Sequence, residues 1–267
     1  MARDEGFFGP SSVSWRVHRE ITVLLGGARA LLMQAAHPLV IAGARDTGFY
    51  ERNPWKRLER TLQLTYAITF GSRQDATQAA THINQVHTRV NGLDPITGKR
   101  YDALDPALLL WVHACLVDSA LLYERLTVGA LDEDGRDQFH REQMLVAEML
   151  EIPREIIPPT ARALRAYVDE MVAGDDLLVT DAARAVAALF DDPPKDAAWR
   201  PMLKVASRWA FGTLHPSLRE QYGVRWTRAH EVATTLGLGC VRLVRPILPP
   251  KIRYIEPALL RARELTR

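Results

Sequence analysis

The apolar residues of this chain recur every three or four positions almost from end to end, which is the spacing of amphipathic helices. Runs of alternating β-branched residues, which would predict strands, are scarce. The pattern predicts about ten helices, and the proline-rich stretches of the second half are short enough to be loops between them. We therefore expect an all-α fold in which residues 1–267 form a single globular multi-helix domain.

The stretch from Ala107 to Leu126 is apolar nearly all round, which is typical of a helix that other helices surround. Asp105-Pro106 precedes it, and this pair suits a helix start. Because the stretch is short and contains His113 and Asp118, we interpret it as the buried central helix of the domain and not as a membrane span.

Another apolar stretch, residues 21–43, is interrupted by Pro38. A proline in a helix removes a backbone hydrogen bond, so the chain should kink or stop near His37. Further helices are predicted from Pro54 to Gly71 and from there to Asn91-Gly92. We interpret the following segment, "LDPITGKRYDALDP", as a turn-rich connection.

The charges and cysteines narrow the class of protein. With 34 Lys and Arg against 32 Asp and Glu, the net charge of +2 does not indicate a nucleic-acid partner. The two cysteines, Cys115 and Cys240, are too few for a disulfide framework, and no Cys/His zinc spacing occurs. The first residues, "MARDEGFFGPSSVSW", lack the apolar segment of a secretory signal, so we expect a cytoplasmic protein.

His82 and His87 should point in different directions from their shared helix. Five residues advance a helix by about 500°, which leaves the two side chains about 140° apart. The apolar stripe of this helix passes through His87 and consists of Ala79, Ala80, Ile83, Val86 and Val90. His87 is therefore predicted to face inward, where its imidazole needs a partner. From this pattern alone, a hydrogen-bonded core histidine is favoured over a metal or haem ligand.

Other histidines are less distinctive. His113 lies in the all-apolar helix and should be buried, and His37 stands beside Gln34 at the break before Pro38. His18 and His140 have charged neighbours, so we expect them at the surface. The sequence does not show whether the inward histidines converge.

Arg57 and Thr61 are four residues apart and share a helix face with Arg60 nearby. A solvated basic patch is the ordinary interpretation of such a helix start. However, the helix becomes more apolar beyond Thr61, so these side chains could hold an anion or a polar ligand at the edge of a dry interior.

Several catalytic motifs are absent from the sequence. It contains no paired Glu-x-x-His motif for a di-iron site and no HExxH. It also contains no GxSxG, P-loop or GxGxxG motif, so hydrolysis by an activated serine, phosphoryl transfer and nicotinamide binding are unsupported.

Taken in order, five segments resemble one family, the catalytic domain of the haem-dependent rubber oxygenase (latex clearing protein). That family also includes the fungal oxygenase that cleaves a farnesyl side chain in mycophenolic acid biosynthesis. The segments are "QAAHPLV", "NPWKRLERT", "FGSRQDATQAATHINQVHTRVNG", "YDALDPALLLWVHACLVDS" and an element near "IIPPT". The resemblance is strongest over residues 28–159 and weak elsewhere.

The resemblance implies an all-α oxygenase that holds haem b non-covalently. His87 in "HTRVNG" matches the position of the family's proximal iron ligand. The resemblance therefore implies that His87 binds the haem iron. Arg57 and Thr61 match a pair that lies near the haem. Arg60 stands where rubber-cleaving members have a lysine, so lysine capping of the iron is not expected. We assign Arg57, Thr61 and Arg60 to the catalytic group and Arg57 also to cofactor binding.

The segments around Gln34, His37 and His113 belong to the same resemblance, so we also place these three side chains near the cofactor. The family's acidic residue proposed as a base cannot be placed, and Asp46 is only a weak candidate.

Three hypotheses follow. The first is a haem-dependent oxygenase that uses O₂ on an apolar small organic substrate; polymer cleavage outside the cell is not expected without an export signal. The second is a haem-binding sensor or carrier without turnover, and the third is a haem-free helical protein that binds an apolar ligand. The oligomeric state is left open. The segment from Arg242 to Tyr254 is basic and apolar, and we expect it to pack against the domain and not against a membrane or a partner.

Overall fold

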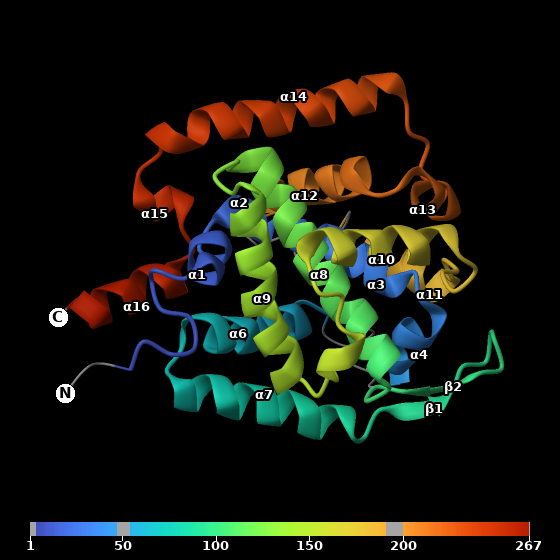
Figure 1. The fold of residues 1–267 in the computed structure, drawn as a ribbon. Coiled ribbons are helices and arrows are strands. Elements are labelled where there is room, and N and C mark those ends of the chain that lie inside the picture. The colour runs from blue at the N-terminus through green and yellow to red at the C-terminus, as the bar shows by residue number, and fades with distance from the viewer. Residues whose placement is uncertain (1–3, 47–53, 191–199, 267) are drawn as a thin grey trace.

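The computed structural model describes residues 4–46, 54–190 and 200–266, and helices dominate all three ranges (Figure 1). The first part contains α1 (Val13–His18), α2 (Ile21–Leu24), α3 (Gly26–Ala35), α4 (Pro38–Asp46), α6 (Pro54–Phe70) and α7 (Arg73–His87). A hairpin of β1 (Asn91–Leu93) and β2 (Arg100–Asp102) follows. The rest comprises α8 (Pro106–Thr127), α9 (Glu133–Met149), η1 (Arg154–Ile156), α10 (Ala161–Ala173), α11 (Asp181–Ala188), α12 (Arg200–Thr213), α13 (Pro216–Gln221), α14 (Arg228–Val244), η2 (Arg245–Ile247), α15 (Pro250–Arg253) and α16 (Glu256–Thr266). The predicted all-α fold is confirmed.

Helix α8 is the centre of the domain, as predicted. Helices α2, α3, α4, α9, α10 and α14 all pack against it, and Figure 1 shows it crossing the middle of the molecule. Asp105 caps its first turn by accepting a hydrogen bond from the Ala107 backbone N–H at 2.8 Å. Trp111, Ala114 and Cys115 are completely buried, whereas Leu116 is 48% exposed, so most but not all of the apolar surface of this helix is covered.

Within the described residues, α8 is the single helix that is long and apolar enough to cross a membrane, and 67% of its most apolar window is buried inside the protein. Helices α2–α3 and α4 would pass the same test together, but the chain bends by 102° between them. The bend is the break predicted near His37: α3 ends at Ala35 and α4 starts at Pro38.

Helices α6 and α7 form an antiparallel pair. Ser72 and Asp75 make a capping box that starts α7 immediately after Gly71. Helix α7 ends at His87, four residues earlier than predicted, because the chain then enters the hairpin, in which Gly92 pairs with Tyr101. The segment is turn-rich, as predicted, but its short β hairpin was not predicted. Strands of three residues are too short to show the alternation that would have revealed them.

Buried polar contacts join distant parts of the chain. Arg29 on α3 forms an ion pair with Asp118 on α8, with 2.7 Å between Nη1 and Oδ2 and side chains that are only 4% and 6% exposed. Glu20, which is 2% exposed, accepts a hydrogen bond at 2.8 Å from Nε of Arg245 near the C-terminus. The contact between Glu20 and Arg245 thus joins the N-terminal and C-terminal helices within one domain.

The segment from Arg242 to Tyr254 packs against the domain only in part, because Arg245 and Tyr254 contact Glu20 while other side chains stay exposed. Leu243 is 79% exposed and Ile247 is 81% exposed. The inner side of α14 already covers α8 and α12, and no described element covers its outer side.

Candidate functional site

The open end of the α6–α7 pair brings two of the predicted haem residues, Arg57 and His87, to one end of the fold. The Arg60 guanidinium donates a hydrogen bond to Nε2 of His82 at 2.6 Å, which sets the register of the two antiparallel helices. Residues before Arg60 on α6 therefore lie level with residues after His82 on α7, at a rise of about 1.5 Å per residue. The backbone of Arg57 and the imidazole of His87 lie at this same open end, although the side chain of Arg57 is outside the described part of the structure.

His87 is the last residue of α7, and its side chain is half-buried with Nδ1 out of contact with solvent. The contrast predicted with His82 is smaller than expected, because His82 is also half-buried. Placing Val86 in the apolar stripe was wrong, since it is 43% exposed. The buried residues of α7, Ala76, Ala79 and Ala80, belong to its first turns, and the helix loses cover towards its end.

Arg60 and Thr61 have exposed side chains. Thr61 accepts a hydrogen bond from Oγ1 of Thr65 through its carbonyl, at 2.9 Å. These two side chains therefore do not lie at the edge of a buried apolar interior, where the alternative interpretation expected them. The roles assigned to Arg57, Arg60 and Thr61 at the cofactor stay predictions.

Gln34 and His37 lie where α3 gives way to α4. Gln34 donates a hydrogen bond from Nε2 to the Val112 carbonyl on α8, at 3.0 Å, which ties this break to the central helix. His37 is 8% exposed, and its Nδ1 has no hydrogen-bond partner among the described residues. Burial lowers the pKa of His37, so its imidazole is neutral at pH 7.

His113 is 5% exposed, as predicted, and its Nε2 has no partner in the described ranges. Burial, with a smaller contribution from the nearby His140, lowers the pKa of this imidazole to about 4. His140 is completely buried, so its predicted surface position was wrong. Its Nε2 donates to the Pro158 carbonyl at 2.6 Å, which leaves Nδ1 as a buried acceptor.

A pattern in the sequence could have located His140. Phe139, Gln143, Met144 and Ala147 are buried with it and recur at helical spacing on α9. The charged neighbour Arg141, which suggested a surface position, lies about 100° further around the helix and is exposed.

The predicted histidines do not share one environment. The charged groups that act on His37 are Asp176, Lys99 and Asp105, whereas His113 faces His140. His87 lies near the end of α7, where Asn84 binds the Met149 carbonyl of α9 at 3.0 Å.

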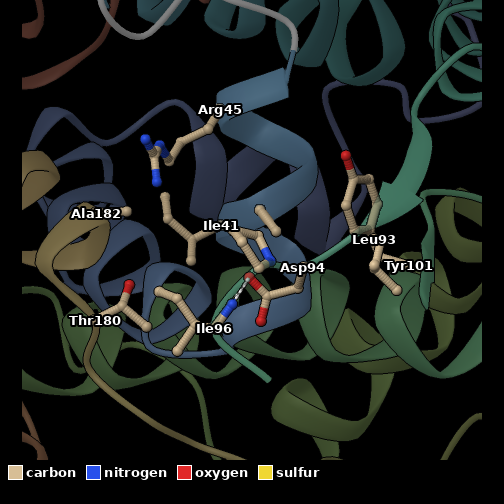
Figure 2. Close-up of a pocket in the computed structure, with 10 residues that line it drawn as sticks. Ile41, Arg45, Leu93, Asp94, Ile96, Tyr101, Thr180 and Ala182 are labelled. Carbon is tan, nitrogen blue, oxygen red and sulfur yellow. Dashed lines mark hydrogen bonds between the residues drawn. The ribbon is translucent and has the colours of Figure 1, made fainter. Parts of the chain in front are cut away.

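A cavity of about 320 Å³ opens beside α4, the β hairpin and the start of α11 (Figure 2). Arg45 and Asp94 are its charged side chains, and apolar walls come from Ile41, Leu93 and Ile96. Burial raises the pKa of Asp94, but hydrogen bonds from Thr97 and Ile96 outweigh burial and hold the pKa below its ordinary value. Asp94 thus stabilises its own turn. None of the predicted haem residues lines this cavity.

The donor set fits haem better than a bare metal ion. Among the described residues, no group of three or more His, Cys, Asp or Glu side chains is gathered to hold a metal. Haem needs only one or two protein ligands, because the porphyrin supplies four nitrogens. The half-buried imidazole of His87 and the unpartnered buried nitrogens of His37 and His113 are ligands of the kind that haem iron takes.

Comparisons with known proteins agree with the sequence resemblance. A model of the family described as "ER-bound oxygenase mpaB/B'/Rubber oxygenase, catalytic domain" matches residues 15–245. Two curated relatives are 26% identical over 231 residues, which cover 83% of this chain and 88% of each relative. They are the uncharacterized proteins Mb2261 from Mycobacterium bovis and Rv2237 from Mycobacterium tuberculosis. No solved structure matches the chain.

Proposed function

Because this chain belongs to the family of the mpaB-type and rubber oxygenase catalytic domains, we propose that it is a haem b-dependent oxygenase that uses O₂ on an apolar small organic substrate. The observation that carries the proposal is the position of His87 at the open end of the α6–α7 pair, within the matched residues. Family membership supports an oxidoreductase of the oxygenase type, and the cofactor, its ligand and the substrate class are the proposed part.

His87 would hold the cofactor through its imidazole. The side chain is half-buried at the end of α7, and a neutral imidazole binds iron through one of its ring nitrogens. When bound, haem supplies the capacity to activate O₂, and the protein supplies binding, orientation and exclusion of water.

Positive charge near His87 suits the carboxylates of haem b. Arg60 is exposed on α6, and Arg57 starts the same helix one turn earlier. A guanidinium can bind a carboxylate through two parallel hydrogen bonds. Thr61 adds a hydroxyl at this end of the fold, which could donate a hydrogen bond to a polar group of the substrate or cofactor.

The absorption spectrum of the reconstituted protein tests the cofactor and its ligand. We expect the 267-residue chain to bind haem and show a Soret band that His87→Ala removes. His82→Gln is the matched control, because His82 is also half-buried on α7 and glutamine keeps an acceptor for the Arg60 guanidinium. A chain that takes up no haem would refute the proposal. A Soret band unchanged in His87→Ala would instead move the ligand to His113 or His37.

Turnover is tested separately from binding. Oxygen consumption with a panel of apolar substrates should exceed that of free haem, and Thr61→Ala should lower the rate while the Soret band remains. Haem binding without oxygen consumption on any substrate would favour a sensor or carrier over an oxygenase.

A further inference from the structure

The outer face of α14 and the segment after it carry exposed apolar side chains. Val232 is 49% exposed, Leu236 63%, Leu243 79%, Ile247 81% and Ile252 55%. Figure 1 shows α14 running along one edge of the molecule above α12 and the end of α8, with α15 continuing from it. We call these five residues the α14–α15 patch. Single exposed apolar residues are ordinary, but a concentration of five on one edge is typical of a binding surface.

The patch is one side of a well-packed helix. Thr234 and Leu238 are 6% and 4% exposed and point into the protein, so the inner face of α14 is satisfied. At about 100° per residue, Val232, Leu236 and Leu243 fall within about 40° of one another on the opposite side. These three side chains therefore form a second apolar stripe, on the outer face of α14, with the spacing of an amphipathic helix.

The segment that carries the patch is basic. Residues 228–253 contain five Arg or Lys and one Glu, whereas the whole chain is nearly balanced. Arg245 and Arg253 pair with the buried Glu20, so the exposed cations of this segment are Arg228, Arg242 and Lys251. Arg228 and Lys251 are exposed, and neither has a hydrogen-bond or ion-pair partner within the described residues. The nearby Glu20 presents no free negative charge, because it is buried and ion-paired with Arg245.

Further apolar surface lies beside the patch. A cavity of about 250 Å³ opens between α2 and the end of α14, and Ile252 and Val244 are among its walls. Val244 is itself 46% exposed. The patch and this cavity together offer apolar area in front of basic side chains, which is the arrangement of surface-bound helices that insert into a lipid interface.

We infer that the α14–α15 patch docks on the surface of an anionic lipid bilayer. Charge complementarity decides between the possible occupants. A symmetric dimer through this face would bring two copies of the same basic segment together, which costs affinity, whereas anionic lipid headgroups neutralise it. The contact is peripheral, since α8 stays inside the fold, and it does not depend on the proposed oxygenase activity.

Vesicle co-sedimentation of the full chain tests the inference. One set of vesicles contains phosphatidylcholine alone and the other an equimolar mixture of phosphatidylcholine and phosphatidylglycerol. We expect binding to the anionic vesicles that weakens at least tenfold in 0.5 M NaCl, because salt screens the headgroup attraction. The Leu243→Ser/Ile247→Ser variant should bind at least tenfold more weakly at low salt.

The matched control is Leu93→Ser/Ile96→Ser, which removes two apolar side chains that are 62% and 53% exposed on the distant β hairpin. It should bind within twofold of the unchanged chain, and circular dichroism should show that both variants are folded. Absence of binding to anionic vesicles, equal binding to both vesicle types, or equal losses in the two variants would overturn the inference. So would a dimer in sedimentation velocity that Leu243→Ser/Ile247→Ser abolishes without vesicles.

Discussion

Acidification should destabilise the haem-free protein through His113. This imidazole is 5% exposed and its pKa falls to about 4, from 6.5 in the unfolded chain, mainly because of burial. The folded protein therefore keeps His113 neutral while the unfolded chain takes up a proton. Stability is complete above the unfolded pKa and is lost as the pH falls from about 6.5 towards 4.

The size of the effect follows from the two pKa values. One pKa unit corresponds to about 1.4 kcal/mol, so the full difference for His113 is about 3 kcal/mol. At pH 5.5 the unfolded chain is about 90% protonated at this site and the folded protein hardly at all, which lowers the free energy of unfolding by about 1 kcal/mol.

Urea unfolding at pH 7.5 and pH 5.5 measures this contribution. His113→Leu should be less sensitive to the pH change than the unchanged chain, by about 1 kcal/mol. Val112→Ala on the same helix is the control, because it removes packing without removing a titrating group. If His113→Leu loses as much stability between the two pH values as the unchanged chain does, the assignment of a depressed pKa to His113 is refuted.

Two further predictions concern packing around α8. Asp118→Ala leaves the buried Arg29 guanidinium uncompensated and should cost about 3–5 kcal/mol of unfolding free energy in the same urea assay. The double variant Arg29→Met/Asp118→Leu should cost less. If the single and the double variant lose the same unfolding free energy, the unpaired charge is not the cause of the loss. A Cβ on Gly26 would meet the Tyr123 ring at 2.9 Å, while one on Gly27 would meet nothing within 4 Å. Gly26→Ala should therefore lower the thermal midpoint and Gly27→Ala should leave it unchanged or raise it, and the same shift in both would contradict the close approach of α3 to α8.

The local features of the fold were predictable from the sequence. Helical periodicity, the break at Pro38 and the buried α8 all appear in the structure where they were expected. These features depend on the backbone geometry of one segment at a time, which nearby residues determine. The candidate site was predictable only as a set of residues, because the resemblance named His87 and Arg57 without showing their surroundings.

Only the tertiary structure decided which faces are covered. It buried His140, exposed Val86, and left Leu243 and Ile247 outside the core, all against expectation. Periodicity shows that a helix has an apolar side, but burial depends on which distant element packs against that side and where the helix outruns its neighbours. The sequence alone thus determined the helices and the candidate haem residues. The packing of α8, α9 and α14 determined which histidines are buried and which apolar face of α14 stays exposed.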